Sequence, residues 1–478
     1  MFIKNVKIKN FRIFKDEFSF PVGRIGIPDG RTKGSGLTIL VGENGVGKTS
    51  VLEAIALPLI SYKSDTLELN DFCDISNNVE IEIEADSNFT VKKTISGEFQ
   101  AQGFKFIAKL RQQNSSRFMV GTAVNDTLFV PADGESIRDG SADLRTSVTN
   151  PFVGSRFNDN EYVYIDKSRT KNLESGMFTA SRFDKILDNF NFQYLQANSN
   201  QPMAVHQAVS DLISADDISN VLLSEAFEDF KQKTGYDVSL NFIDDALPFK
   251  KAYLGFTDID RKQIPISKLG SGYQMFLSLI CQQKLSLQSG KKLILLIDEI
   301  ELHLHPKLQK QLVDILLEFS KTSQIIPTSH SPELLKDLQK NKKHKINVLV
   351  REDTNITVNP IKKFVLPMPT ISETNFVAFN LASMEYFIEL YNQFGELNGA
   401  SSVAAIDRLL SADGTPTIAW TRDDGTTQYL TMISCVRNKF HHPSNTANDT
   451  NINMGYEDIL GYTETLRTKI TAVSTATS

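Results

Sequence analysis

Cysteine is scarce in this chain of 478 residues, which contains only Cys73, Cys281 and Cys435. The three lie far apart, and none has a second cysteine at the short spacing of a zinc ribbon. The sequence therefore excludes a disulfide framework and a cysteine-rich metal module. We expect all three thiols to be small, buried, apolar residues.

Long hydrophobic runs and an excess of positive charge are also absent. No stretch approaches the roughly 20 apolar residues of a membrane span, and the N-terminal residues alternate charged and apolar side chains, unlike a signal peptide. The net charge of −6 and the pI near 5.8 give no overall basic field for nonspecific nucleic-acid binding. We therefore expect a cytoplasmic protein without a membrane partner, and the charge does not favour a nucleic-acid partner.

Residues 42 to 49 read Gly-Glu-Asn-Gly-Val-Gly-Lys-Thr and follow the apolar run Leu37 to Val41, which predicts a buried strand. This pattern is a phosphate-binding loop, in which backbone N–H groups surround the phosphates of a nucleoside triphosphate, here ATP. Lys48 would bring positive charge to the β and γ phosphates, and the Thr49 hydroxyl would ligate Mg²⁺. An apolar helix predicted from Val51 would present its N-terminal dipole end to the phosphates. The predicted ATP-binding residues of this loop are Gly42, Asn44, Gly45, Gly47, Lys48, Thr49 and Ser50.

Two further apolar runs end in residues suited to nucleotide chemistry. Residues 292 to 299, Lys-Leu-Ile-Leu-Leu-Ile-Asp-Glu, predict a buried parallel strand with two carboxylates at its C-terminal edge. Asp298 would hold Mg²⁺ through water, and Glu299 would polarise the attacking water. The run Ser323 to Thr328 predicts a second strand, after which His330 would contact the γ-phosphate.

Gly270, Ser271 and Gly272 open another predicted helix, upstream of the acidic strand. Glycines and a serine at a helix N-terminus form an anion site, although such turns are common by themselves. The order of phosphate loop, Gly-Ser-Gly helix, Asp-Glu strand and Ser-His strand is more specific. It resembles the ATP-binding-cassette ATPases of the branch that contains RecF, the double-strand-break repair ATPases and the structural-maintenance-of-chromosomes proteins. This resemblance implies that the Gly-Ser-Gly turn contacts the ATP of a second subunit.

A closer resemblance is to the stand-alone ATPases of prokaryotic antiviral systems, including the overcoming-lysogenization-defect proteins and the ATPase subunits of Septu and PARIS. The segments that carry it are Ile3 to Phe14, Asp298 to Pro306 and Thr328 to Pro332. Two positions depart from the pattern. Tyr273 stands where many relatives carry a charged or amide residue, and Ile300 stands where they usually have proline.

The long interval between the phosphate loop and the acidic strand leaves room for an inserted lobe. Val79 to Ile83 and Thr90 to Ile95 alternate like a hairpin, and residues 180 to 235 predict helices. The absence of a long heptad array argues against the coiled-coil arm of the double-strand-break repair ATPases. Gln100 and Gln102 are both candidates for the glutamine of a switch loop.

The predicted fold class is α/β, a P-loop NTPase of the ATP-binding-cassette type with an inserted α+β lobe and an appended C-terminal helical bundle. Tyr162 to Arg169 predicts a strand that returns toward the nucleotide. The predicted boundaries are 1–60 for the first part of the ATPase, 61–260 for the insert, 261–363 for the second part of the ATPase and 364–478 for the bundle.

The bundle is predicted from apolar residues that recur at helical spacing beyond the stiff, proline-containing segment Leu366 to Pro369. These residues fall in three groups, and each group predicts a helix. The first runs from Met384 to Tyr391, the second from Tyr429 to Phe440 and the third from Ile459 to Ile470.

The second of these predicted helices ends in Arg437-Asn438-Lys439-Phe440-His441-His442. Arg-Asn followed after three residues by His resembles the active-site motif of HEPN ribonucleases, which implies metal-independent RNA cleavage by paired subunits. His442 would be the general acid or base, and Arg437 beside Asn438 would stabilise phosphate charge. The alternative is a helix C-terminus whose basic residues complement the helix dipole, in a bundle that serves dimerisation.

Together these features predict a Mg²⁺-dependent ATPase that acts as an oligomeric sensor, switch or scaffold in bacterial anti-phage defence and controls a separate effector, a nuclease or toxin. Its expected partners are that effector and further copies of the chain, joined through ATP-sandwiched heads and the bundle. Two alternatives stay open. One is a self-contained, ATP-gated ribonuclease toxin similar to ATPase-linked anticodon nucleases, and the other is a DNA-repair ATPase of the RecF kind.

Overall fold

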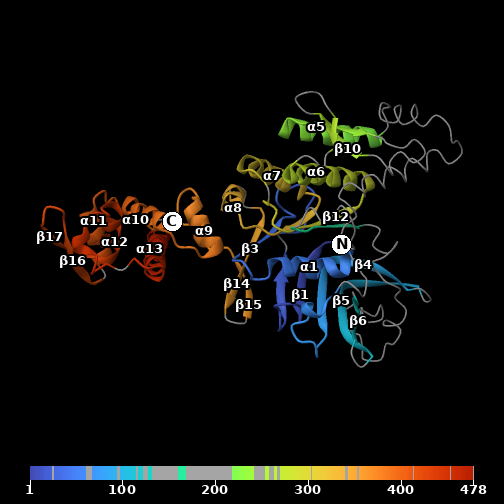
Figure 1. The fold of residues 1–478 in the computed structure, drawn as a ribbon, viewed down its shortest axis with the longest axis horizontal. Coiled ribbons are helices and arrows are strands. Elements are labelled where there is room, and N and C mark those ends of the chain that lie inside the picture. Colours follow the sequence, from blue (N-terminus) through green and yellow to red (C-terminus); the bar gives the residue numbers. More distant parts are fainter. Residues whose placement is uncertain are drawn as a thin grey trace. The chain divides into compact units, whose positions relative to one another are not determined.

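The apolar runs predicted as strands form the centre of a parallel sheet in this computed structural model (Figure 1). Strand β3 is Thr38–Gly42, β12 is Lys292–Ile297 and β13 is Gln324–Pro327. Nearly all their side chains are buried, as is typical of parallel strands that are covered on both faces. Strand β12 pairs with β13 on one side and with β8, Asn160–Ile165, on the other, while β14, Lys345–Glu352, pairs with β3.

The structure describes residues 1–23, 26–60, 67–93, 97–114, 117–121, 128–131, 160–167, 218–241, 253–257, 263–265, 270–302, 304–339, 343–352, 355–412, 414–452 and 454–476. The chain divides into two compact units, Met1–Pro360 and Ile361–Ser478. This division lies close to the boundary predicted between residues 363 and 364.

Parallel bridges between Leu37 and Ile325 and between Leu40 and Thr328 place β3 beside β13. The strands therefore follow the order β15-β14-β3-β13-β12-β8, with β15, Asn355–Pro360, antiparallel to β14. Parallel strands end at the same edge of a sheet. The phosphate loop after β3, the Asp-Glu pair after β12 and the Ser-His pair after β13 consequently share one edge, as the sequence predicted.

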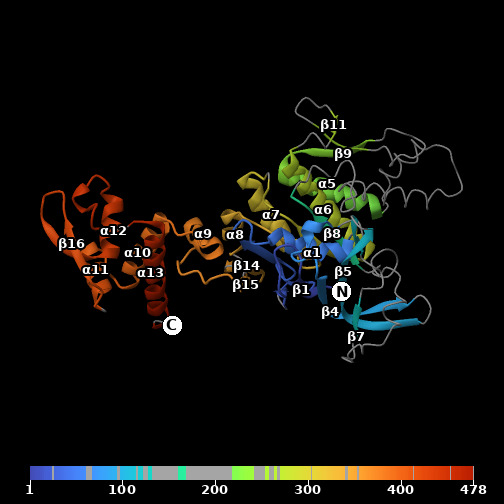
Figure 2. The same cartoon turned by 60° about the horizontal axis from the view of Figure 1, so that its bottom comes forward.

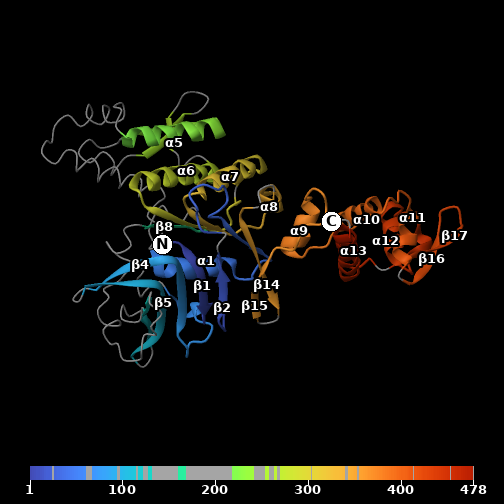
Figure 3. The same ribbon diagram turned by 180° about the vertical axis from the view of Figure 1, so that it is seen from behind.

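A second, antiparallel sheet has the order β2-β1-β4-β5-β6, and β7 also pairs with β5. Its strands are β1 Ile3–Lys9, β2 Phe18–Pro21, β4 Val79–Lys93, β5 Gly97–Asn114, β6 Arg117–Gly121 and β7 Leu128–Pro131. Helix α1, Lys48–Ile60, lies between the two sheets (Figure 3). One apolar cluster joins Ile8 of β1, Val51 and Ile55 of α1, and Ile294 of β12. Helix α1 is apolar on several sides because both sheets pack against it.

The predicted hairpin of Val79 to Ile83 with Thr90 to Ile95 is wrong. Val79 to Lys93 form the single strand β4, which pairs with β5 and has a register shift between Glu84 and Phe89. The irregularity separates two stretches of alternating apolar and polar residues within one strand. The sequence pattern of this strand is therefore the same as that of two shorter strands joined by a turn. Because β4, β5 and β8 pair with strands of the ATPase, these parts of the predicted insert, 61–260, belong to its sheets.

Helices α5, Ile218–Thr234, and α6, Ser271–Ser289, lie side by side (Figures 1 and 2). Strands β9 Asp237–Asn241, β10 Tyr253–Thr257 and β11 Gln263–Pro265 form a small antiparallel sheet. Helices α7, Pro306–Phe319, and α8, Pro332–Leu338, follow β12 and β13, and each begins with a proline, which is favoured at the first position of a helix. Helix α5 agrees with the last part of the helices predicted over 180 to 235, whereas residues 180 to 217 lie outside the described residues.

The C-terminal unit contains a β-hairpin in addition to its helices. Its elements are α9 Ile371–Phe379, α10 Met384–Leu397, α11 Val403–Ser411, β16 Thr417–Thr421, β17 Thr427–Thr431, α12 Met432–His441 and α13 Tyr456–Ala476. The prediction that Tyr429 belongs to a helix is wrong, because it lies in β17 and the helix begins only at Met432. The Thr431 side chain caps that helix by accepting a hydrogen bond from the backbone N–H of Ser434.

Two of the three cysteines are buried as predicted. Cys281 lies in α6 and Cys435 in α12, and burial raises the pKa of each thiol to about 12. The prediction for Cys73 is wrong, because its side chain is exposed. Cys73 follows the one-turn helix Leu69–Asp71, where the neighbouring Phe72 enters the core and Cys73 does not.

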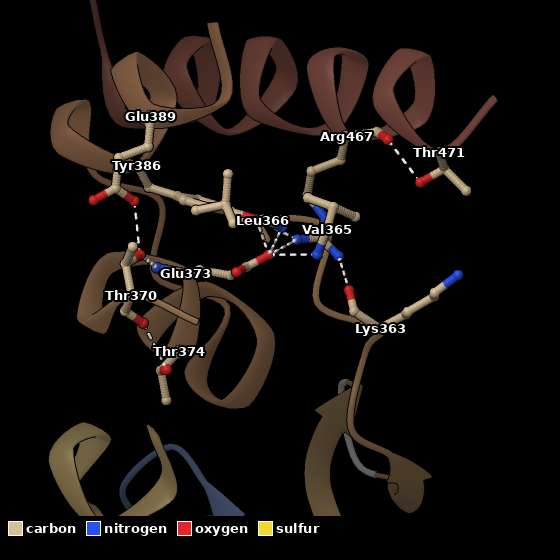
Figure 4. A network of polar contacts seen from close by, with 10 residues as sticks. All are labelled: Lys363, Val365, Leu366, Thr370, Glu373, Thr374, Tyr386, Glu389, Arg467 and Thr471. Carbon is tan, nitrogen blue, oxygen red and sulfur yellow. Dashed lines mark hydrogen bonds and ion pairs between the residues drawn. The ribbon is translucent and has the colours of Figure 1, made fainter. Parts of the chain in front are cut away.

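A buried carboxylate orders the start of the C-terminal unit (Figure 4). Glu373 of α9 is fully buried, and its Oε1 accepts hydrogen bonds from the backbone N–H of Val365 (2.6 Å) and of Leu366 (3.2 Å). The same oxygen accepts from the Tyr386 hydroxyl (3.3 Å) and lies 3.6 Å from Nη1 of Arg467. Burial raises the pKa of Glu373, and these donors oppose that shift. The contacts fix the chain at its exit into this unit.

Candidate nucleotide-binding site

The phosphate loop connects β3 to α1 through glycines with positive φ, 142° at Gly42 and 94° at Gly47. A Cβ at Gly42 would lie 2.5 Å from the carbonyl oxygen of Leu349, and one at Gly47 would lie 2.5 Å from Cδ1 of Ile13 and 3.0 Å from Cζ of Phe14. Only glycine fits both the conformation and the space. The opening segment of the chain therefore packs directly on the loop.

Lys48 is buried at the start of α1, with 5% of its surface exposed. Its Nζ donates hydrogen bonds to the carbonyl oxygens of Gly42 (2.8 Å) and Glu43 (2.6 Å). Burial lowers the pKa of Lys48 to about 8, although Asp298 and Glu299 favour the charged form. A partly desolvated cation on the inner side of the loop is suited to phosphate binding.

The Asp298 carboxylate is held between two threonines. Its Oδ2 accepts from the Thr49 hydroxyl (2.9 Å), and its Oδ1 accepts from the Thr328 hydroxyl (2.6 Å). The Thr328 oxygen in turn accepts from the backbone N–H of Glu299 (2.7 Å). Residues from α1 and from the ends of β12 and β13 thus meet at one point, as predicted for Thr49 and Asp298.

A hydroxyl and a carboxylate fit Mg²⁺, which prefers oxygen ligands and is bound through few protein side chains together with substrate phosphates. Thr49 and Asp298 are the residues that would hold it. Among the described residues, no group of three or more histidine, cysteine or acidic side chains is arranged to bind a metal.

Glu299 has a left-handed backbone conformation, with φ of 45°. A residue other than glycine rarely adopts this conformation, which costs about 1 kcal/mol or more and is found preferentially at functional sites. Here the hydrogen bond from its N–H to Thr328 fixes the turn that ends β12. The predicted catalytic glutamate is thus held by the strand end that carries Asp298.

His330 follows β13 and connects to the segment after β12. Its backbone N–H donates to Oε1 of Glu301 (2.5 Å), and Glu301 is itself largely buried. Burial first, and then the positive charge of Lys48, lowers the pKa of the His330 imidazole. The imidazole is thus close enough to Lys48 for the lysine charge to affect its protonation. A side chain that contacts the terminal phosphate is expected to lie near this lysine.

Sequence reasoning missed a charged cluster beside this site. Nε of Arg12 donates to Oδ1 of Asp71 (2.8 Å), and its Nη1 forms an ion pair with Glu53 of α1. Burial raises the pKa of Glu53, and the charge of Arg12 opposes that shift. Arg12 belongs to the opening segment Ile3 to Phe14, but its partners, Glu53 and Asp71, are far away in sequence.

Gln100 and Gln102, the two candidates for the glutamine of a switch loop, both lie in β5.

The Gly-Ser-Gly turn begins α6, with Gly270 as its N-cap residue. Gly270 is exposed, and the nearest atom that its Cβ would meet is Cδ2 of Tyr273, at 3.9 Å. Gly272 is buried, whereas Gly270 leaves room for an approaching group.

Three residues of the other predicted site lie together in the C-terminal unit. Arg437, Asn438 and His442 all line a pocket of about 440 Å³. Nη1 of Arg437 donates to Oδ1 of Asn438 (3.2 Å).

No described helix is long and apolar enough to cross a membrane.

A known protein family is matched by the segment that contains all the nucleotide-site motifs. Residues 37–336 match the family model described as "AAA domain, putative AbiEii toxin, Type IV TA system". The chain belongs to this family. The P-loop NTPase fold predicted from the sequence is therefore confirmed.

Two curated relatives support the same grouping. The chain is 26% identical over 390 residues to the "OLD nuclease" of Thermus scotoductus (strain ATCC 700910 / SA-01), an alignment covering 75% of this chain. It is 24% identical over 353 residues to the "Retron Vc95 probable ATPase" of Vibrio cholerae serotype O1 biovar El Tor, covering 62% of this chain. The aligned regions span 66% of the length of each relative, slightly under two thirds. The predicted resemblance to ATPases of prokaryotic defence systems is confirmed.

Solved structures of SMC head domains are similar at a lower level. A head bound to the C-terminal winged-helix domain of ScpA has a TM-score of 0.45 at 15% identity, covering 76% of this chain and 98% of that one. A second, with an extended coiled coil and with ScpA derived from Pyrococcus furiosus, has a TM-score of 0.42 at 14% identity, covering 76% and 96%.

We expect ATP binding to take up protons above pH 8. In the free protein the pKa of Lys48 is lowered to about 8, so a growing share of Lys48 is neutral as the pH rises from there toward 10.5. Phosphate charge favours the protonated form and raises the pKa again, so binding in this window must take protons from solution. Calorimetry at about pH 9 in two buffers of different ionisation enthalpy measures this uptake. Equal binding enthalpies in the two buffers would contradict it.

Proposed function

We propose that this chain is a Mg²⁺-dependent ATPase whose subunits pair around ATP, and that it acts as a nucleotide-gated switch in prokaryotic anti-phage defence. The observation that carries the proposal is the meeting of Lys48, Thr49, Asp298 and Glu299 at one edge of the parallel sheet. The proposal includes control of a separate effector, a nuclease or toxin.

The residues divide the chemistry among them. When ATP binds, Lys48 exchanges the loop carbonyls for the β and γ phosphates, where its charge offsets that of the phosphates. Glu299 accepts a hydrogen bond from the attacking water and orients it toward the γ-phosphorus. Thr49 and Asp298 would hold Mg²⁺, which would supply positive charge against the charge developing on the phosphate oxygens. His330 contacts the γ-phosphate and transmits its presence to Glu301.

The open Gly270 turn supports pairing of two subunits. A helix N-terminus with exposed backbone attracts anions, and a Cβ at the exposed N-cap Gly270 would meet no atom closer than 3.9 Å. In a symmetric pair, the turn of each subunit would face the γ-phosphate held by the other, so each site would need both chains. ATP would then hold the pair together, and hydrolysis would release it.

We expect Ser271→Arg to prevent ATP-dependent association, because a long side chain fills the turn that must approach the partner's ATP. Light scattering measures the mass with and without ATP. The matched control is Ser289→Arg, the same substitution at the opposite end of α6. If both variants associate like the wild type and hydrolyse ATP normally, the composite site is wrong.

The role in defence is supported by the OLD and retron relatives and by the family. Phage plating on cells that carry the chain, with and without the neighbouring reading frame, tests control of a separate effector. Protection that needs no neighbouring gene would contradict this part of the proposal.

A second candidate function is RNA cleavage by the C-terminal unit, which the shared pocket of Arg437, Asn438 and His442 favours. In that case Arg437→Ala and His442→Ala should each abolish toxicity and RNA cleavage in chelator, with ATP hydrolysis and oligomer mass unchanged. If the unit serves association alone, the wild-type chain should leave RNA uncut in chelator. We place the switch first, because hydrogen bonds fix all four residues of its site, Lys48, Thr49, Asp298 and Glu299.

A further inference from the structure

The β16–β17 hairpin, α11 and α12 pack together in the C-terminal unit (Figures 1 and 2). Residues of the hairpin, of the start of α11 and of the C-terminal end of α12 line one pocket. The hairpin contributes Trp420, Arg422, Asp423 and Asp424 to its lining, and the end of α12 contributes Arg437 and His442. Its volume of about 440 Å³ is in the range of roughly 300–1,000 Å³ found for small-molecule sites.

The lining of the pocket includes a cation, Arg437, that lacks a counter-ion within the described part of the chain. Nε of Arg437 is buried and has no hydrogen-bond partner, and Nη1 donates only to the neutral amide oxygen of Asn438. Within the described part of the chain, Arg437 forms no ion pair, whereas Lys439 of the same helix is paired with Asp449 at 2.5 Å. A partly buried guanidinium without a carboxylate is costly unless an anion joins it. The site is thus prepared for a phosphate or carboxylate group of a ligand.

The hairpin turn adds two exposed carboxylates, Asp423 and Asp424, and the cation Arg422, whose Nη2 donates to Oε1 of Gln428 (2.7 Å). Oδ1 of Asp424 accepts hydrogen bonds from the backbone N–H (2.9 Å) and the hydroxyl (2.6 Å) of Thr426, and these bonds lower the pKa of Asp424, so it is ionised at neutral pH. Asp423 precedes it in the same turn. Carboxylates accept hydrogen bonds from amino and imino groups and repel anions. A ligand for this pocket therefore needs an anionic group and hydrogen-bond donors.

Trp420 provides an apolar wall of the pocket. It packs with Leu430 and Cys435 in a small cluster, and both Trp420 and Leu430 line the pocket. A flat apolar surface of this kind suits a heteroaromatic ring. The combination of anion, ring and ring-borne donors describes a nucleotide.

We propose that this pocket binds a nucleoside monophosphate unit, either free or within single-stranded nucleic acid. Its phosphate is held by Arg437 and His442, its base lies against the Trp420 wall, and the amino groups of the base donate to Asp423 and Asp424. Guanine, which offers two adjacent donors on one edge, is bound most tightly, and uracil, which has no amino group, most weakly. The proposal does not depend on ATP hydrolysis or on RNA cleavage.

Trp420 is the only tryptophan of the chain, so its fluorescence reports on this pocket alone. Full-length Lys48→Ala protein, in which the phosphate loop is disabled, is titrated with each of the four nucleoside monophosphates, with short single-stranded oligonucleotides and with inorganic phosphate. We expect saturable quenching with GMP, or with a guanine-containing oligonucleotide if the unit is bound within a chain. Saturation by GMP indicates a free nucleotide, and saturation by the oligonucleotide alone indicates nucleic acid.

Arg437→Gln should weaken this binding by about tenfold or more, since it removes a charge-assisted hydrogen bond. Arg408→Gln is the matched control, with the same loss of charge on an exposed residue of α11 that does not line the pocket. Asp423→Asn should reduce the preference for guanine over uracil. Melting temperatures show whether the variants fold, and ligand should raise that of the wild type but not that of Arg437→Gln.

Three results would overturn the proposal. The first is unchanged fluorescence with every nucleotide and oligonucleotide, and the second is equal affinity for inorganic phosphate and GMP. The third is equal weakening by Arg437→Gln and Arg408→Gln in variants that melt like the wild type.

Discussion

Lys48→Ala should abolish ATP binding at the phosphate loop, with a loss of affinity of about a hundredfold or more. The buried ammonium group is the positive charge that the loop directs to the β and γ phosphates, and each charge-assisted hydrogen bond is worth roughly 1.5–3 kcal/mol. Calorimetry with Mg²⁺-ATP measures the loss. Any weak residual binding should belong to the C-terminal pocket and disappear when Arg437→Gln is added.

Two control variants separate loss of charge from loss of fold. Lys48→Met keeps the apolar part of the side chain and most of its volume, so it should fold like the wild type and still fail to bind ATP. Lys33→Ala removes an exposed lysine that pairs with Glu318, and it should bind ATP normally. Unchanged ATP affinity in folded Lys48→Met protein would remove the central site from this account.

Glu299→Gln should bind ATP normally and hydrolyse it at least about a hundredfold more slowly. Glutamine keeps the size of the side chain and the backbone hydrogen bond to Thr328, but it loses the carboxylate that orients water. Single-turnover hydrolysis and nucleotide binding, measured on the same preparation, distinguish slow chemistry from weak binding.

The matched control for Glu299→Gln is Glu43→Gln, which changes an exposed acid within the phosphate loop. Glu43 contributes only its backbone carbonyl to the bond with Lys48, so this variant should hydrolyse ATP nearly as fast as the wild type. If the two substitutions slow hydrolysis equally, loss of any negative charge near the phosphate loop is enough to slow the reaction. The carboxylate of Glu299 then has no specific role.

The core of the fold was predictable because its strands are continuous apolar runs with clear ends. Strands β3 and β12 read as buried strands from the sequence, and the prolines at 306 and 332 mark the first residues of α7 and α8. Parallel strands end at one edge of a sheet, so the approach of Thr49 to Asp298 followed from the motifs alone.

The remainder depends on contacts between distant parts of the chain. The pairing of Arg12 with Glu53 and Asp71 has no local signal, because a charged residue on a helix or strand reads as solvated. The length of β4 is set by its pairing with β5 across an irregularity. The approach of Trp420 and Asp424 to Arg437 requires the hairpin to fold back on α12, which helical periodicity could not reveal.

Mixing two inactive variants tests the composite ATP site most directly. Lys48→Ala lacks a working phosphate loop, and Ser271→Arg lacks a working turn, so each alone should hydrolyse almost no ATP. In a mixed pair, one of the two sites combines the intact loop of one chain with the intact turn of the other. The account predicts that mixing restores hydrolysis, up to roughly a quarter of the wild-type rate for a symmetric pair with independent sites. No recovery after mixing, with both variants folded and able to exchange subunits, would contradict it.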